Sequence, residues 1–263
     1  IASLLAKRTD FKSVAVISIA AAVHVGILVL EKDLGAALIY FVTYLMMLYV
    51  ATMKLRYLAA GFFAGTAASV VAYQLFAHVR VRVAAWQDPW SNMNQGGYQI
   101  CQSLFAIGTG GLFGMGLGQG MPKSVPVVES DFIFSAIAEE MGVIFCIFLI
   151  LIYISSFIMF VNIALKMKKN FYKLCAFGLS VVLIFQVFLS IGGVTKFIPS
   201  TGVTLPLISY GGSSIITTIV IFSIIQGMYV RNRREEVTTN EEQAAINRKS
   251  GKAVNARTGK WRL

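Results

Sequence analysis

Charged residues are scarce in this chain. Asp, Glu, Lys and Arg make up only 13% of its 263 residues, against about 25% in a typical soluble domain. Hydrophobic residues make up 57%, and the mean hydropathy is +0.72. The composition argues against a soluble globular domain and indicates that a lipid bilayer is the solvent.

Histidine and cysteine are also scarce. The two histidines, His24 and His78, lie within or at the end of apolar runs, so we interpret them as packed or interfacial residues rather than ligands. The three cysteines show no CxxC spacing, and two of them lie inside apolar runs, where a thiol behaves as a small hydrophobe. We therefore expect neither a disulfide nor a zinc site.

Long apolar runs are what the sequence has in abundance. Six of them approach or exceed the ~18 to 20 residues that cross the hydrocarbon core of a bilayer. They cover about residues 13–30, 35–53, 57–77, 132–161, 171–191 and 213–230. The first run is a span rather than a signal peptide, because similar runs follow it and no small-residue cleavage site stands out. The sequence predicts an all-α fold, a polytopic transmembrane helix bundle of about six spans.

The net charge of +11 follows the predicted topology and does not indicate nucleic acid as a partner. Eighteen of the 23 basic residues lie before the first span, in every second connection and in the tail. The remaining five are Lys32, Arg80, Arg82, Lys123 and Lys196. Under the positive-inside rule this bias places both termini in the cytoplasm. An even number of spans also puts both termini on the same side of the membrane, so the charge bias and the six spans agree.

The predicted outer connections differ greatly in length. The first has about four residues, whereas the second covers about residues 78–131 and the third about 192–212. Loops carry function more often than the elements that they connect, so we expect the site in the two long ones. Residues 1–230 form the predicted transmembrane catalytic domain, and residues 231–263 form a basic cytoplasmic tail. We expect the tail to be disordered and to anchor on anionic membrane lipids. The chain begins at Ile1 in a juxtamembrane-like stretch, so we expect earlier spans to precede it.

Glycine is concentrated in the large outer connection. Seven of the thirteen residues from Gly108 to Gly120 are glycine, which permits close backbone approach and positive φ. No GxGxxG string occurs there, and Pro122 stands where a Walker motif requires glycine before Lys123. The run does not predict a nucleotide site. Tight helix packing and direct contact with a substrate both stay open.

Carboxylates stand at the start of the fourth span, in the string ESDFIFSAIAEEMG. Asp131 lies at the boundary, where it is either a helix N-cap or a catalytic group. In a continuous helix Glu139 would lie about 12 Å further along the axis, on the same stripe as Asp131 and Ser135. Carboxylates inside a membrane are costly and are functional candidates by default. For Glu139 and Glu140 we favour structural pairing.

Basic residues on the outer side form a second candidate group. Arg80 and Arg82 depart from the charge bias and precede the aromatic string AAWQDPW, so snorkelling and interfacial anchoring account for part of their placement. Fixed cations are also what a membrane-bound diphosphate requires, because Arg and Lys form charge-assisted hydrogen bonds to phosphate. Lys123 and Lys196 belong to the same group.

The last outer connection reads GGVTKFIPSTGVTLPLISYGGSS and is too irregular for a lipid-exposed helix. It has two prolines, five glycines and many hydroxyl side chains. Non-helical backbone at membrane depth is tolerated only against protein or a wet cavity. We therefore predict a re-entrant loop that walls a site beside Asp131.

Several strings in this chain resemble the SEDS family of shape, elongation, division and sporulation proteins, which includes the FtsW, RodA and SpoVE types. They are EKDLG, GYQICQSLFAIGTGGLFGMGLGQG, ESDFIFSAIAEEMG and FIPSTGVTLPLISYGGSS. The resemblance extends to about Arg234 and implies an enzyme of about ten spans in the bacterial cytoplasmic membrane, the first four of which would be missing here. One residue departs from the family's pattern: Ser190 stands where many members have Asn. This difference affects only the assignment to a subgroup of the family.

The resemblance implies a peptidoglycan glycosyltransferase. It would polymerise lipid II, the undecaprenyl-pyrophosphate-linked disaccharide pentapeptide, with inversion and with a class B penicillin-binding protein as partner. Asp131 matches the family's catalytic acid and would act as general base. The residues expected to bind substrate are Glu31, Asp33, Arg80, Gln99, Lys123, Lys196 and Ser209. The cofactor requirement stays open between none and a divalent cation, Mg or Mn.

Two other functions compete with this interpretation. A flippase or transporter for a lipid-linked precursor would use Glu139, Glu140 and the glycine-rich segment for alternating access, although no clear internal repeat supports it. A non-catalytic scaffold would recruit the penicillin-binding protein through its spans.

Overall fold

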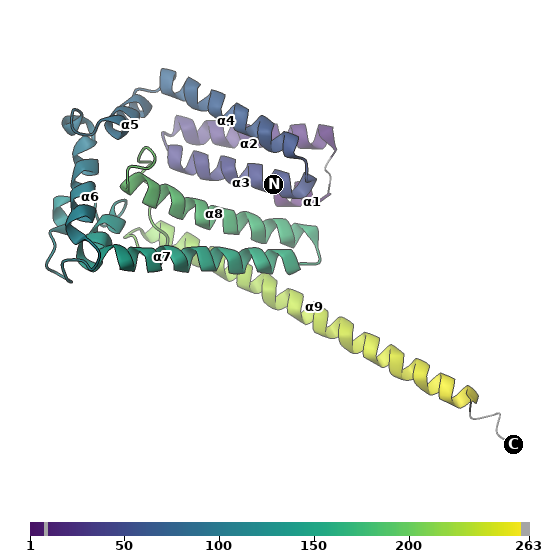
Figure 1. Cartoon of the computed structure of the whole chain (residues 1–263). Coiled ribbons are helices and arrows are strands. Elements are labelled where there is room, and N and C mark those ends of the chain that lie inside the picture. The colour runs from purple at the N-terminus through teal and green to yellow at the C-terminus, as the bar shows by residue number, and fades with distance from the viewer. Residues whose placement is uncertain (8–9, 259–263) are drawn as a thin grey trace.

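The computed structural model describes residues 1–7 and 10–258, and every regular element in those ranges is helical (Figure 1). A short helix, α1 (Ala2–Lys7), precedes six helices that are long and apolar enough to cross a membrane. These are α2 (Phe11–Leu30), α3 (Leu34–Thr52), α4 (Leu55–Leu75), α7 (Ile133–Lys166), α8 (Asn170–Val194) and the first part of α9, Gly212–Thr238. The predicted all-α fold with six spans is confirmed.

The helix α8 forms the centre of the bundle. Half of the residues in its most apolar 18-residue stretch are buried, which is the largest share among the six spans. The helix packs against α3 and α7 on either side (Figure 1). Lipid gives apolar helices no hydrophobic reason to associate, so close contact between spans depends on small residues. Gly178 of α8 provides such a contact, because the Met47 side chain of α3 occupies the space that a Cβ would need.

The helix α4 lies at the edge of the bundle and has no buried residue. It touches α3 through two glycines, since Gly61 lies against the Leu45 side chain and Gly65 against Phe41. At Phe76 the backbone is extended, with φ −107° and ψ 114°, and the chain turns there into the next helix. The edge position leaves α4 attached to the bundle mainly along one side.

The large outer connection contains helices that the sequence did not predict. Between α4 and α7 the chain forms α5 (Ala77–Gln87), η1 (Met93–Gln95), α6 (Gly97–Gly110) and η2 (Pro122–Ser124). In Figure 1, α5 and α6 lie across one end of the bundle, where α2, α4 and α8 end and α3, α7 and α9 begin. All three connections predicted to be outer therefore share one end of the molecule.

The helix α7 is interrupted at Gly142, which has φ 82° and ψ 171°. The freed backbone groups bond to the glycine-rich segment: Met115 and Gly116 donate to the carbonyls of Glu139 and Glu140 at 2.9 and 3.0 Å. Beyond the break, Val143 and Ile144 donate to the carbonyls of residues 111 and 112. The helix is therefore not continuous past Gly142, and these hydrogen bonds attach the glycine-rich segment to α7 on both sides of the break. The helical stripe predicted for Asp131, Ser135 and Glu139 does not start at Asp131, because that residue precedes α7.

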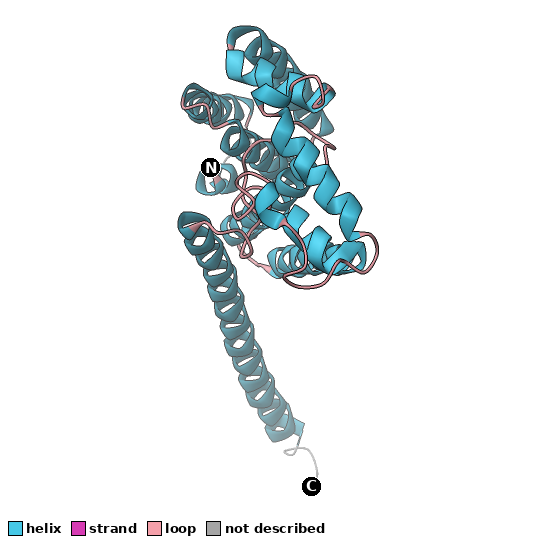
Figure 2. Ribbon diagram, turned by 90° about the vertical axis from the view of Figure 1, so that its left-hand side faces the viewer, coloured by secondary structure: helices cyan, strands magenta, loops and turns pink. Residues whose placement is uncertain are grey.

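The last helix, α9 (Gly212–Thr258), has 47 residues and leaves the bundle as one long rod (Figures 1 and 2). It runs through most of the basic segment for which the composition predicts disorder. The domain boundary near residue 231 and the anchoring role of the tail stay predictions.

Replacement of Gly142 tests the break in α7. A Cβ at this position would collide with the backbone of residues 112–114. The backbone conformation alone costs a non-glycine residue about 1–3 kcal/mol. We expect Gly142→Ala to lower the thermal midpoint of the purified full-length protein in detergent by several degrees. Gly108→Ala is the matched control, because nothing lies within 4 Å of its Cβ and alanine favours the helix. Equal midpoints for the two variants would contradict the described break.

Candidate functional site

Residues 195–211 re-enter the bundle between α8 and α9. Leu205 and Pro206 at the centre of this loop are fully buried. The Tyr153 hydroxyl, in the second half of α7, donates a 2.5 Å hydrogen bond to the Pro206 carbonyl. From α8, the Gln186 amide donates to the Thr204 carbonyl at 3.1 Å. Side chains of the spans therefore satisfy the carbonyls that this irregular backbone brings into the membrane layer.

A second set of hydrogen bonds fastens the loop to the segment before α7. The Ser209 hydroxyl, which is buried, accepts from the Leu205 N–H at 2.7 Å and donates to the Ser130 carbonyl at 2.5 Å. Next to it, the Tyr210 N–H donates to the Glu129 carbonyl at 2.7 Å. These bonds fix the backbone of the two residues directly before Asp131, the predicted catalytic acid.

Asp131 lies beside the loop with its carboxylate unengaged. Its Oδ2 atom is 3.3 Å from the point where a Cβ of Gly202 would stand. Phe132, not Asp131, is the N-cap of α7, and no side-chain hydrogen bond caps that helix. Within residues 1–7 and 10–258 the Asp131 carboxylate has neither a hydrogen-bond nor an ion-pair partner, although it is partly buried. Capping does not account for this residue, and its oxygens are free to accept a proton.

The helix α5 lies against the loop and attaches to it by two hydrogen bonds. Arg82 donates to the Ser200 carbonyl at 3.2 Å, and the Trp86 indole donates to the Lys196 carbonyl at 3.0 Å. Arg80 is exposed and donates instead to a backbone carbonyl of α4 at 2.6 Å. Of the two arginines, the structure brings Arg82 to the loop and leaves Arg80 outside it.

Lys196 lies at the start of the loop in a left-handed conformation, with φ 58°. Its charge acts on Asp88, whose pKa is held below the ordinary value chiefly by hydrogen bonds from Ser91 and to a lesser extent by Lys196. Burial raises the pKa of the nearby Cys101 thiol. Lys196 thus has the Asp88 carboxylate close by.

The remaining predicted binding residues lie around this end of the bundle. Lys123 is exposed on η2, and Gln99 of α6 donates to the Pro126 carbonyl at 3.3 Å. Asp33 caps α3 by accepting from an N–H of its first turn at 2.9 Å, and Glu31 is exposed just before it. These placements leave the substrate-binding roles as predictions.

The segment that contains Glu31 and Asp33 reaches the re-entrant loop through Gly35. This glycine is buried at the start of α3, against the side chains of Thr201 and Val203. Those two residues flank Gly202, which faces Asp131. The strings EKDLG and PSTGVTLP, far apart in the sequence, therefore meet on one side of the site.

Glu139 and Glu140 hold the glycine-rich segment by its backbone. Glu139 is only 6% exposed, and its Oε1 accepts from the Met121 N–H at 3.1 Å. Glu140 accepts from the Gly118 N–H at 3.2 Å. Neither carboxylate forms an ion pair with another described residue. Their observed contacts are with a loop rather than with a pathway through the bundle.

The described part of the chain does not provide a metal site of its own. No group of three or more His, Cys, Asp or Glu side chains within it is arranged to hold an ion. Asp131 alone does not make such a site, so we derive no step through a metal. The three cysteines are free thiols.

The fold and the site define a multi-pass membrane protein with an unengaged carboxylate beside a re-entrant loop at one end of its bundle. The family model described as "Cell cycle protein", covering FtsW, RodA and SpoVE, matches residues 1–234, and the chain belongs to this family. The resemblance stated from the sequence is confirmed.

Two similar proteins are named as peptidoglycan glycosyltransferases. The "Peptidoglycan glycosyltransferase RodA" of Mycobacterium tuberculosis (strain ATCC 25618 / H37Rv) is 42% identical over 203 residues, which are 77% of this chain and 43% of that protein. The "Probable peptidoglycan glycosyltransferase FtsW" of Geobacter sp. (strain M18) is 35% identical over 80% of this chain and 58% of that protein. The chain thus spans roughly half the length of these curated relatives.

A solved structure shares the fold. It is described as "Structural coordination of polymerization and crosslinking by a peptidoglycan synthase complex". The TM-score is 0.73 at 26% identity, over 88% of this chain and 66% of that one. This chain and the solved structure are therefore similar in three-dimensional fold.

Three residues at the site were absent from the predicted substrate-binding set. Arg82 belongs to the basic group that the sequence offers for a diphosphate but not to that set, Trp86 is predicted only as an interfacial aromatic residue, and no role is predicted for Gln186. A polar amide inside an otherwise apolar span is a signal that could have identified Gln186. For Arg82 and Trp86 no local signal separates a residue that faces the loop from one that faces lipid.

Replacement of Ser209 tests the attachment of the loop. Ser209→Ala leaves the buried Leu205 N–H and the Ser130 carbonyl without partners, at a cost of about 1–3 kcal/mol for each group. We expect a lower thermal midpoint and faster proteolysis of the loop in the full-length protein. Ser213→Ala is the control, since that side chain is exposed and makes no hydrogen bond to a described residue. A midpoint unchanged from wild type in Ser209→Ala would contradict the described attachment.

Proposed function

We propose that this chain is the catalytic part of a peptidoglycan glycosyltransferase, which polymerises lipid II into glycan strands on the outer face of the bacterial cytoplasmic membrane. The family and the names of the relatives support this class of reaction. The observation that carries the proposal for this chain is the unengaged carboxylate of Asp131 beside Gly202. A general base requires an acceptor atom that no protein donor already occupies.

In the proposed reaction, Asp131 accepts the proton of a sugar hydroxyl on one lipid-linked disaccharide. The hydroxyl oxygen attacks the anomeric carbon of the second lipid-linked chain and forms the new glycosidic bond. The bond from that carbon to the diphosphate breaks, and undecaprenyl pyrophosphate leaves with its electron pair. A single displacement of this kind inverts the configuration at the anomeric carbon.

The negative charge that develops on the leaving diphosphate calls for fixed cations. We propose Lys196, Lys123 and Arg80 for this role and add Arg82, because its hydrogen bond to Ser200 holds it at the loop. Charge-assisted hydrogen bonds from these groups would favour departure of the diphosphate. Gln99 and Ser209, whose observed bonds shape the surrounding backbone, would position the sugar, with Glu31 and Asp33 on the far side of the loop.

The partner and the orientation belong to the same proposal. A class B penicillin-binding protein would use the strands that this chain makes, in keeping with the polymerization and crosslinking in the description of the similar structure. The positive-inside rule would place both termini of the chain in the cytoplasm and the Asp131 end outside. The flippase interpretation gains no support, because Glu139 and Glu140 are engaged with loop backbone.

Asp131→Asn tests the general base. An amide cannot accept the proton, and general base catalysis contributes about 10²- to 10⁴-fold, so we expect at least a hundredfold loss of polymerisation. The measurement is in-gel polymerisation of fluorescent lipid II by the full-length protein with its partner, with and without a chelator. Glu129→Gln is the control, since that side chain is exposed two residues away. Glycan ladders of equal strength from Asp131→Asn and wild type would remove Asp131 from the mechanism, and loss of product on chelation would establish the cation requirement.

Gly202→Ala tests the geometry around that base. Gly202 has φ +73°, which strains any L side chain, and its Cβ would press on Oδ2 of Asp131. We expect about a tenfold or greater loss of polymerisation from displacement of the carboxylate. Gly108→Ala should retain wild-type activity, because its Cβ meets nothing. Full activity in Gly202→Ala would show that the loop does not position Asp131.

A further inference from the structure

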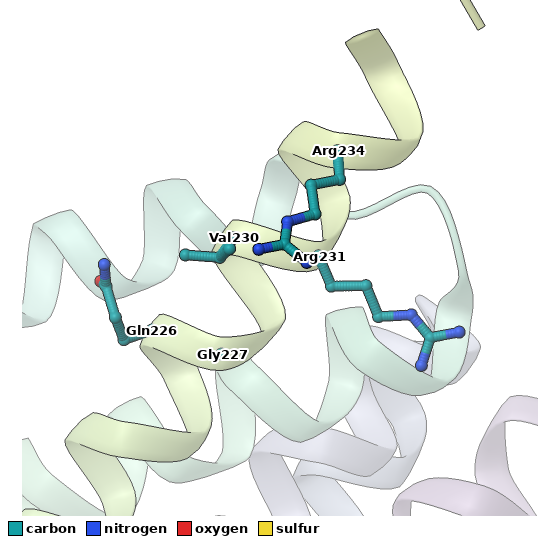
Figure 3. A pocket seen from close by; sticks show the side chains of 5 residues that line it. All are labelled: Gln226, Gly227, Val230, Arg231 and Arg234. Carbon is teal, nitrogen blue, oxygen red and sulfur yellow. The ribbon is translucent and has the colours of Figure 1, made fainter. Parts of the chain in front are cut away.

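A hollow of about 450 Å³ opens on the surface of α9, at the end of the bundle away from Asp131 (Figures 1 and 3). It is lined by Gln226, Gly227, Val230, Arg231 and Arg234. The volume falls within the range of about 300–1,000 Å³ that small-molecule sites occupy. None of the functional residues considered above contributes to it.

Gly227 leaves open space at one side of the hollow. Nothing lies within 4 Å of the point where a Cβ of Gly227 would stand. About two and three helical turns before it, Val220 and Ile216 lie on the same face of α9 and are 48% and 64% exposed. Apart from the exposed Ser223, an apolar strip therefore leads along this face to the hollow, and its polarity suits an acyl chain.

Two arginines end this strip, and they differ in their surroundings. Arg231 lies over the Tyr172 ring at 5.0 Å and donates to Glu235 at 3.3 Å. Arg234 is exposed and has no ion-pair partner among the described residues. Figure 3 shows its side chain running back along α9 toward Val230, while Arg231 points to the other side. One guanidinium is held in place, and the other is free to receive an anion.

The segment of α9 that bears the hollow is bonded to the turn between α7 and α8. The Asn232 side chain accepts from the Lys168 N–H at 3.4 Å and donates to the Lys166 carbonyl at 3.3 Å. Lys169 pairs with Glu235 at 3.5 Å. The backbone of this turn is thus bonded to Asn232, beside the two arginines, at the end of the bundle that the charge bias assigns to the cytoplasmic leaflet.

We propose that this hollow binds one anionic phospholipid of the cytoplasmic leaflet. The lipid phosphate would bond to Arg234, because a guanidinium group matches phosphate oxygens bidentately. One acyl chain would fill the space above Gly227 and follow Val220 and Ile216 along α9. A zwitterionic lipid would bind less well, since its own cation would meet Arg234 and the lysines of the turn.

The test is a titration of the full-length protein with phosphatidylglycerol or phosphatidylcholine, with bound lipid counted by native mass spectrometry. We expect the wild type to retain one phosphatidylglycerol in preference to phosphatidylcholine. Arg234→Gln should weaken that affinity about fivefold, since a basic side chain near an anionic lipid surface contributes on this order. Gly227→Leu should weaken it at least as much by filling the hollow, without a collision inside the protein.

Two matched control variants distinguish binding at this hollow from a general effect of surface charge. Arg233→Gln removes the same charge from a neighbouring residue outside the hollow, and Gly26→Leu adds the same side chain to another open glycine in a span. Both should bind phosphatidylglycerol as the wild type does. Equal weakening in Arg234→Gln and Arg233→Gln would overturn the proposal, as would equal binding of the two lipids or unchanged affinity in Gly227→Leu.

Discussion

The need to satisfy every backbone polar group at membrane depth governs the organisation of this protein. Residues 195–211 are not helical, yet they enter the bundle, so side chains of the spans must replace the missing helical hydrogen bonds. Tyr153 and Gln186 do this from α7 and α8, and Ser209 does it within the loop. The Ser209 hydroxyl also joins the loop to the Ser130 carbonyl before α7, where Asp131 lies beside Gly202. The Ser209 hydroxyl therefore both stabilises the loop and fixes the backbone next to the carboxylate of Asp131.

The break in α7 applies the same constraint at a second place. A glycine-only conformation at Gly142 frees backbone groups, and the glycine-rich segment after α6 pairs with them. Glu139, which is buried, and Glu140, which is partly exposed, accept from N–H groups of that segment. The outer layer of α5 and α6 is therefore fixed to the spans on two sides, at the break in α7 and at the re-entrant loop.

The sequence predicted those features that depend on local composition. Spans follow from the length of apolar runs, and a re-entrant loop follows from prolines and glycines where a helix would otherwise continue. It did not predict α5 and α6, nor that Arg82 rather than Arg80 reaches the loop, because these depend on how the outer layer folds back over the bundle. The interruption of α7 was missed for a similar reason: a single glycine in an apolar run is compatible with a continuous helix until its partner segment is known. Asp131 was identified as a candidate, but only the structure separates a free carboxylate from a helix cap.

In the proposed function, the re-entrant loop acts on the reaction through Asp131. A double-mutant cycle measures this directly, with lipid II polymerisation rates for Asp131→Asn, Ser209→Ala and the double variant of the full-length protein. Residues that act as one unit show strongly non-additive losses. We predict that Ser209→Ala slows the wild type but leaves the residual rate of Asp131→Asn unchanged. If the two losses multiply in the double variant, the loop and the carboxylate act independently, and the account is contradicted.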